Sequence, residues 1–283
     1  MIDYSIIDTH LHLWDTKKFR YPWLDEIPAL NRTFSLDDYN RACGDVKVRK
    51  MVFMQCECLP SQYMHEIGWI TELSKTDARI SGIVSWAPLE KGERVRPEIE
   101  LLKKNSLVKG LRRIIQGEPD LEFCLGSDFV QGVNLLSEYD LTFDICISYL
   151  HNKNVIKFID QCPDVRMILD HIGKPNIKDR VMNPWFDEIK EISKFPNVYC
   201  KLSSLATEAD HLNWTIDDIR PYVDHLVECF GFERLVFATD WPVSSLAASI
   251  PMCVNTLVTI LKGCSQAELD RVFTRNALDF YHI

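Results

Sequence analysis

Short apolar runs alternate along this chain with segments of helical periodicity. Runs rich in Val, Ile, Leu and Phe, as in buried strands, lie at residues 4–10, 50–56, 80–88, 107–115, 141–148, 165–171, 197–203 and 234–240. Between them, apolar residues recur every three or four positions, which predicts amphipathic helices, at residues 61–75, 95–105, 128–139, 154–162, 183–195 and 219–232. Strands that alternate with helices predict βαβ units and a parallel sheet.

The repeat number indicates the architecture. Eight strand candidates in 283 residues are typical of a closed (β/α)₈ barrel, or TIM barrel, for which about 250 residues is usual. The competing doubly wound sheet usually carries a glycine-rich first turn, whereas this chain has 11 glycines and neither GxGxxG nor GxxxxGK[ST]. We therefore expect one α/β domain, residues 1–283, ending in a C-terminal helix over 265–283 that starts with a Ser265/Glu268 capping box. Residues 15–34 and 203–215 are predicted to form loops over the barrel mouth.

Composition and charge argue against nucleic acids and membranes as partners of this protein. A formal charge of -9 argues against nucleic acid or an anionic membrane, since both require a basic patch. No run approaches the roughly 20 apolar residues of a membrane span, and the N-terminus lacks the pattern of a secretory signal. The 10 cysteines are scattered and lie mostly in apolar runs, which indicates buried free thiols. We expect a cytoplasmic protein with a small-molecule partner; homo-oligomerisation stays open.

The first strand ends in an unusual row of polar residues. In IIDTHLHLWD, the alternation of a strand puts Asp8, His10 and His12 on one face. A single histidine in such a place is more often a hydrogen-bonded core residue. Two imidazoles at i and i+2, however, can converge on one cation or on one substrate oxygen.

Polar residues also close the other predicted strands, and barrel enzymes carry their active sites at the carboxyl ends of strands. Beyond the two histidines these residues are Gln55, Glu57, Trp86, Arg112, Arg113, Asp170, His171, Lys174, Lys201, Ser203 and Asp240. Asp240 could cap the helix that follows, but a carboxylate that closes the run RLVFA is better explained by catalysis, and His171 is interpreted in the same way. Lys174 fits a solvated loop equally well.

Several residues are candidate substrate contacts. Adjacent strand residues face opposite ways, so at most one of Arg112 and Arg113 points into the mouth, and the other is packed or ion-paired. Aromatic residues near strand ends and loops could stack on a sugar ring or only fill the core. The predicted substrate-binding residues are Arg112, Arg113, Lys174, Tyr21, Trp23, Trp86 and Trp241.

Five motifs together carry a resemblance to a known family. IDTHLHLWD, YPWL, LDHIGKP, VYCKLSSLATEADH and TDWPV occur in this order over nearly the whole chain. They resemble the amidohydrolase superfamily, and within it the amidohydrolase-2 branch that contains sugar lactonases and the 2-pyrone-4,6-dicarboxylate lactonase. The resemblance implies a (β/α)₈ barrel that hydrolyses an ester within a ring, with His10, His12, His171 and Asp240 as the catalytic core.

The resemblance also bears on cofactors. Binuclear amidohydrolases place a histidine at the end of strand five, but here that strand ends in DICISYL, and His151 does not match the position. We therefore expect either one divalent metal ion, zinc first, held by His10, His12, His171 and Asp240, or no metal. Without a metal, the histidines can donate hydrogen bonds to an oxyanion, assisted by an arginine or lysine.

The resemblance implies the hydrolysis of a sugar-acid lactone, which we expect to be of the L-fucono, L-rhamnono or L-galactono type. Asp240 would take a proton from water and return it to the departing alkoxide. A dicarboxylate substrate needs several convergent arginines, and only Arg112 and Arg113 are obvious candidates. The alternatives are a 2-pyrone-4,6-dicarboxylate-type lactonase, a metal-dependent decarboxylase of the same superfamily, and a barrel that has lost catalysis.

Overall fold

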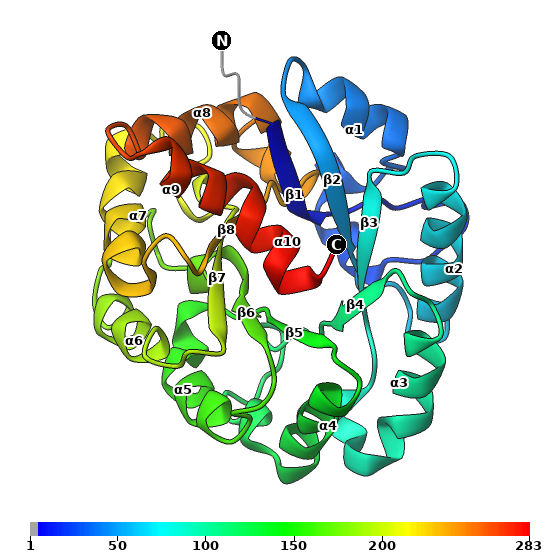
Figure 1. Ribbon diagram of the computed structural model, residues 1–283. Helices are drawn as coiled ribbons and strands as arrows, with labels where there is room; N and C mark the ends of the chain where they lie inside the picture. Colours follow the sequence, from blue (N-terminus) through cyan, green and yellow to red (C-terminus); the bar gives the residue numbers. More distant parts are fainter. Residues whose placement is uncertain (1–4) are drawn as a thin grey trace.

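Eight parallel strands form a single sheet, in the order β1 to β8, in the computed structural model, which describes residues 5–283 (Figure 1). They are β1 Ser5–Leu11, β2 Lys47–Met54, β3 Ile80–Ser85, β4 Val108–Leu111, β5 Thr142–Ile145, β6 Met167–Leu169, β7 Val198–Leu202 and β8 Leu235–Phe237. The sheet closes where β1 meets the segment after β8: the Asp240 amide donates to the His10 carbonyl at 2.9 Å, and the His12 amide donates to the Trp241 carbonyl at 2.8 Å. The predicted TIM barrel is confirmed.

Helices surround the strands, as the alternating pattern predicts (Figure 1). They are α1 Leu36–Cys43, α2 Tyr63–Ser74, α3 Arg96–Lys103, α4 Ser127–Glu138, α5 Asn152–Asp160, α6 Trp185–Ile192, α7 Ile216–Phe230, α8 Ile250–Ile260, α9 Gln266–Asp270 and α10 Asn276–Tyr281. The periodicity analysis missed α1 and α8. The first is only 8 residues long, although Ser35 and Asp38 form a capping box at its start. In the part of the chain that the structure describes, no helix is long and apolar enough to cross a membrane.

The C-terminal helix forms the floor of the barrel. Its start carries the predicted capping box of Ser265 and Glu268, and a π-helical turn at Arg271–Arg275 divides it into α9 and α10. Phe280 and Tyr281 of α10 belong to a buried cluster with strand residues of the barrel interior, namely Ile7, Val52, Met54, Val84, Ile168 and Val236. In Figure 1, α10 lies in red across this end of the strands. The opposite end of the barrel is therefore left for the site.

The strands end earlier than their apolar runs predict, because the chain turns out of the sheet just before the polar residues. Strand β6 ends at Leu169, and His171 has a φ of 52°. Strand β8 ends at Phe237, and Asp240 has a φ of 58°. Non-glycine residues rarely adopt this left-handed region, and such residues cluster at functional sites. The backbone thus turns these side chains away from the strand direction.

Candidate active site

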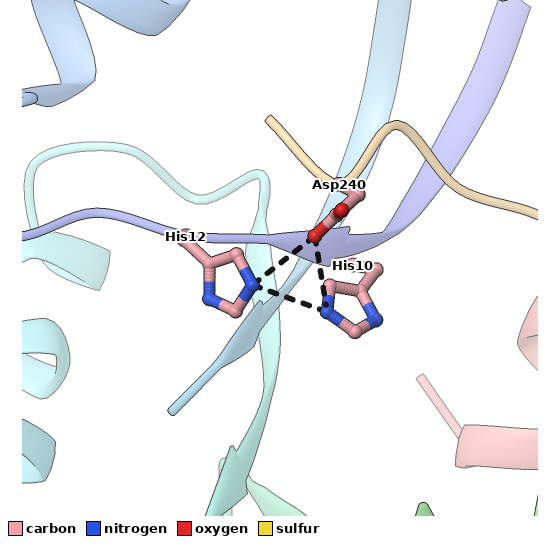
Figure 2. A group of neighbouring side chains, drawn as sticks. All are labelled: His10, His12 and Asp240. Atoms are coloured by element: carbon pink, nitrogen blue, oxygen red, sulfur yellow. Dashed lines mark hydrogen bonds and ion pairs between the residues drawn. The ribbon is translucent and has the colours of Figure 1, made fainter. Parts of the chain in front are cut away.

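The seam between β1 and β8 brings His10, His12 and Asp240 together (Figure 2). The Nε2 atoms of His10 and His12 lie 3.2 Å apart, and Asp240 Oδ1 lies 3.5 Å from the first and 3.3 Å from the second. All three side chains are buried. The i, i+2 spacing on β1 and the backbone contact between His10 and Asp240 together produce this cluster.

Asp8 does not join the cluster, contrary to the strand pattern. Its carboxylate accepts hydrogen bonds from the Tyr39 hydroxyl at 2.8 Å and from the Thr239 amide at 2.9 Å. The register of β1 against β2 shifts between Asp8 and Leu11, so strict alternation does not hold over these residues. Asp8 instead ties α1 and the residue before Asp240 to β1.

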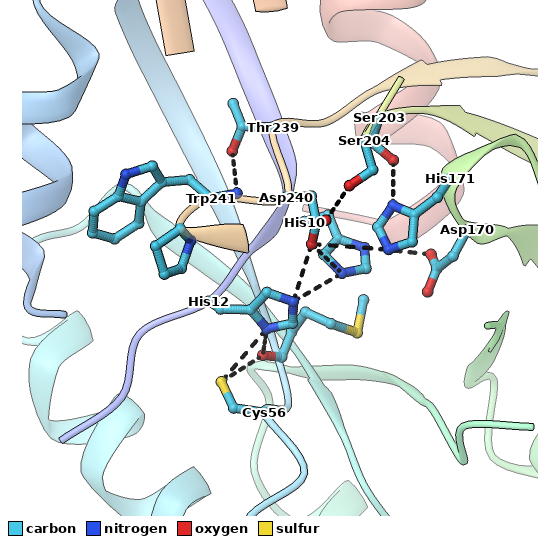
Figure 3. Close-up of polar contacts among 12 residues, drawn as sticks. His10, His12, Cys56, Asp170, His171, Ser203, Ser204, Thr239, Asp240 and Trp241 are labelled. Carbon is cyan, nitrogen blue, oxygen red and sulfur yellow. Dashed lines mark hydrogen bonds and ion pairs between the residues drawn. The ribbon is translucent and has the colours of Figure 1, made fainter. Parts of the chain in front are cut away.

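His171 completes the group from the end of β6 (Figure 3). Its Nε2 lies 3.8 Å from Asp240 Oδ1, and its Nδ1 lies 2.8 Å from the Ser203 hydroxyl, which follows β7. The neighbouring Ser204 hydroxyl donates to the other carboxylate oxygen of Asp240. Thus the four residues predicted as a catalytic core lie around one point, and two serines orient them.

The side chain of His12 is fixed by contacts at Nδ1, the ring nitrogen that does not face Asp240. Its Nδ1 lies 2.9 Å from the Met54 carbonyl oxygen and 3.5 Å from the Cys56 thiol (Figure 3). A carbonyl only accepts, so Nδ1 carries the proton and the Nε2 lone pair faces Asp240 and His10. This is the tautomer that a metal ligand or a proton acceptor requires.

Arg112 and Arg113 point to different surroundings. Arg112 is buried in the barrel: its Nη1 lies 3.1 Å from His10 Nε2, and its Nη2 donates to the Gln55 carbonyl at 2.7 Å. Arg113 instead pairs with Glu90 at 3.2 Å and with Glu118 at 2.6 Å. Only Arg112 therefore reaches the cluster, and a substrate role for Arg113 stays a prediction.

Two buried ionic residues that the sequence analysis left without a role stand beside His10. Asp170 Oδ1 lies 3.4 Å from His10 Nδ1 and 2.9 Å from the ammonium group of Lys201. Asp144, on β5, is the second carboxylate that contacts Lys201. A charged residue inside an apolar strand run, as in VYCKL and LTFDICIS, was the available signal, because buried charges require partners.

Burial keeps the imidazoles of His10 and His171 neutral, whereas the Asp240 carboxylate stays charged. Burial lowers the pKa of His171 to about 4, although the Asp240 and Asp170 charges oppose the shift. Burial also lowers the pKa of His10, again against the Asp170 charge. For Asp240 burial works in the opposite direction, but the neighbouring imidazoles, His171 first, hold its pKa well below the usual value.

The cluster fits a single divalent metal ion. One ligand atom from each of His10, His12 and Asp240 lies within 4.8 Å of the others, and His10, Asp170 and His171 form a second such group. Two imidazole nitrogens with a carboxylate oxygen are a ligand set that zinc takes, with room left for water. The two groups share the His10 side chain.

A cleft of about 680 Å³ opens among the loops that follow β5 to β8. Its lining includes Lys174, Glu208 and Tyr149, and part of the predicted mouth loop 203–215. Burial raises the pKa of Glu208, with Lys174 opposing the shift. Lys174, for which the sequence left two interpretations, thus lies on the wall of a ligand-sized cleft.

The four predicted aromatic contacts all have packing or hydrogen-bonding partners. Trp241 is buried, with Phe34 and Tyr39 rings each at 5.4 Å. Trp23 donates to the Cys56 carbonyl at 2.9 Å, Trp86 packs on Tyr63 and Tyr21 is buried. Their contact with a substrate stays a prediction.

The fold and this site together match one class of protein. A family model described as Amidohydrolase matches residues 7–283, and the chain belongs to that family. An L-fucono-1,5-lactonase from Burkholderia ambifaria is 27% identical and aligns over 98% of this chain and 95% of its own. An L-rhamnono-gamma-lactonase from Scheffersomyces stipitis is 24% identical over 100% of both chains. The crystal structure of an amidohydrolase from Burkholderia multivorans with bound zinc has a TM-score of 0.89 and 26% identity, covering 99% of this chain and 100% of that one.

Proposed function

We propose that this protein hydrolyses a sugar-acid lactone of the L-fucono, L-rhamnono or L-galactono type. The observation that carries the proposal is the buried Asp240 carboxylate facing His10, His12 and His171. A lactone hydrolase needs a base for water, a group that stabilises an oxyanion, and an acid for the leaving oxygen. The likeness to proteins named as sugar lactonases supports the same substrate class.

Asp240 is the base and then the acid of the proposed reaction. It accepts a proton from water as the water oxygen adds to the lactone carbonyl carbon. The ring C–O bond of the tetrahedral intermediate then breaks, and Asp240 returns the proton to the departing ring oxygen. The Ser204 hydroxyl fixes one carboxylate oxygen, which leaves the other facing the imidazoles.

The oxyanion is stabilised by a cationic side chain that the fold already holds in place. Arg112 brings a permanent positive charge to 3.1 Å from His10 Nε2, inside a buried site where charge interactions are strong. When bound by His10, His12 and Asp240, a divalent metal ion supplies Lewis-acid polarisation of the carbonyl oxygen.

The cleft wall favours a neutral sugar over a dicarboxylate. It presents Lys174 and Lys178, but also the carboxylates of Glu208 and Asp210. With two ammonium groups and two carboxylates, the wall offers no excess of positive charge to hold a dianionic ligand, whereas hydroxyl groups of a sugar can bond to both kinds of group. On this ground we propose the dicarboxylate lactonase only as the second candidate.

The proposal is tested by measuring acid release, with a pH indicator, from a panel of five- and six-membered sugar lactones. We expect turnover of a 6-deoxy-sugar or galactose-type lactone, and a loss of at least about 10²-fold in Asp240→Asn. Asp217→Asn is the matched control, because that side chain is 93% exposed on α7. Wild-type rates no higher than those of Asp240→Asn on every lactone would overturn the proposal. Carbon dioxide release from an aromatic acid would favour the decarboxylase.

A further inference from the structure

A series of contacting polar and charged side chains runs through the barrel from the C-terminal helix to the catalytic cluster. We call this series the column; its members are Tyr281, Asp144, Lys201 and Asp170. The Tyr281 hydroxyl on α10 donates to Asp144 at 2.8 Å. Asp144 pairs with Lys201, whose ammonium group lies 2.9 Å from Asp170. Asp170 in turn lies 3.4 Å from His10 Nδ1. The floor and the site are thus joined by direct contacts.

Every member of this column is removed from water. Asp144, Lys201 and Asp170 are each 0% exposed, and Tyr281 is 1% exposed. Barrel interiors are usually filled by Val, Ile and Leu in layers. Replacing a buried ion pair by apolar residues is often neutral or stabilising, so stability alone does not explain charges at these positions.

The column ends at Nδ1 of His10, the ring nitrogen that does not contact Asp240. Lys201 Nζ lies 3.3 Å from His10 Nδ1, and Asp170 contacts the same nitrogen. The other ring nitrogen, Nε2, faces His12, Arg112 and Asp240. The ion pair of Lys201 and Asp170 therefore contacts Nδ1 of the His10 imidazole, and Nε2 faces the reacting centre.

We propose that Lys201 is a positioning residue and that Tyr281 extends its control to the C-terminal helix. Lys201 holds Asp170 against His10 Nδ1, which sets the rotation of the imidazole and the direction of Nε2. Tyr281 fixes Asp144, which fixes Lys201. Tyr281 thus joins the C-terminal helix to the active site through its contact with Asp144. The kinetic consequence of this inference rests on the proposed function, whereas its structural consequence does not.

The kinetic test uses Tyr281→Phe, which deletes one hydroxyl and keeps the ring. We expect kcat to fall about ten-fold with KM unchanged, because small misplacements of a catalytic group are costly. The control is Phe280→Leu, a neighbouring buried residue of α10 that packs on Tyr199 at 4.9 Å. It should lower the melting temperature and leave kcat within about two-fold of the wild type. Equal kcat in Tyr281→Phe and the wild type would overturn the proposal.

A second variant separates positioning from charge balance. Lys201→Met combined with Asp144→Leu removes one positive and one negative charge, so the barrel interior keeps its net charge. We expect this variant to fold and to show a larger loss of kcat than Tyr281→Phe. A folded double variant with wild-type kcat would contradict the inference.

A spectroscopic test needs no substrate. In protein labelled with ¹⁵N-histidine, the His10 ring signals are assigned by their loss in His10→Gln. We expect them to shift in Tyr281→Phe and in the double variant, and to stay in place in Phe280→Leu. Unchanged His10 signals in all three variants would refute the column even if no lactone were hydrolysed. Shifted signals with no lactone turnover by the wild type would uphold it and refute the proposed function.

Discussion

The guanidinium of Arg112 and the imidazole of His10 are in direct contact inside the barrel, with Nη1 3.1 Å from Nε2. A guanidinium has only donors, so His10 Nε2 accepts and the ring proton lies on Nδ1, toward the Asp170 carboxylate at 3.4 Å. The Lys201 ammonium also lies 3.3 Å from Nδ1, but it donates to the carboxylates of Asp144 and Asp170. Arg112 therefore fixes the tautomer in which the His10 lone pair faces the centre of the cluster. The same nitrogen is the one offered to a metal ion or a substrate.

The first prediction concerns this contact. Arg112→Lys keeps the charge but cannot reach His10 and the Gln55 carbonyl together, since an ammonium group lacks the planar fork. We expect kcat/KM for the lactone to fall by about 10² or more. In the paired variant Arg113→Lys, steady-state constants should stay within about two-fold, because Arg113 pairs with Glu90 and Glu118. A rise in KM for Arg113→Lys would assign that residue to the substrate instead.

The second prediction concerns the serine behind His171. Ser203→Ala removes the partner of His171 Nδ1, a hydrogen bond of 2.8 Å, and leaves the imidazole free to rotate. We expect kcat to fall about five-fold while KM changes little, since a neutral hydrogen bond is worth about 1 kcal/mol. Ser137→Ala, on the exposed side of α4, is the control. Equal kcat values in the two variants would show that Ser203 does not orient the ring.

The third prediction concerns pH. Burial lowers the pKa of His171 to about 4, so this imidazole is neutral above about pH 5, and Asp240, whose pKa is held well below its usual value, is ionised over that whole range. Activity should be level from about pH 6 to 8 and should decline only as the pH falls toward 4, when His171 gains a proton. The check is kcat/KM measured by chromatography of the hydroxy acid, with spontaneous hydrolysis subtracted. Half-maximal activity near pH 6.5 would indicate an unshifted histidine.

The fourth prediction concerns zinc. We expect the metal-free protein to bind one zinc ion, and His12→Gln to weaken that binding by at least about ten-fold, because His12 contributes one nitrogen ligand. Competition with a chromophoric chelator measures the affinity without an activity assay. His65→Gln, an exposed residue of α2, should bind zinc as the wild type does. Identical affinities for the two variants would place the ion elsewhere.

The fifth prediction concerns stability. Burial raises the pKa of Glu66 to about 8 from an ordinary value of 4.5. Between these values the folded protein holds a proton that the unfolded chain releases, so this contribution is complete below pH 4.5 and is lost as the pH rises toward 8. Between these two pH values the unfolding free energy should fall by about 1.4 kcal/mol for each unit of rising pH.

Denaturant unfolding of Glu66→Gln across this range tests the slope. The neutral amide should remove it, so the variant gains stability relative to the wild type as the pH rises. Glu72→Gln, on the same helix and 69% exposed, should show no such trend. A difference between Glu66→Gln and the wild type that stays constant with pH would contradict the prediction.

Local pattern determined much of this protein. Alternating strand and helix periodicity is a property of short segments, and it was sufficient to predict eight strands, the barrel and the ends at which His10, His12, His171 and Asp240 lie. The short helix α1 was missed although Leu36, Tyr39 and Cys43 recur at helical spacing, because 8 residues are too few for the pattern to stand out. The spacing of the two histidines on β1 was enough to place them on one face.

Only the tertiary structure decided how the charges are paired. Asp144, Lys201 and Tyr281 come from β5, β7 and the C-terminal helix, and no spacing along the chain relates them. The same holds for Asp8, whose partners are on α1 and beside Asp240. Barrel closure brings β1 next to the segment that follows β8. An unpaired charge is costly in the buried interior of the barrel, so each buried charged group pairs with a partner that only the closed barrel supplies.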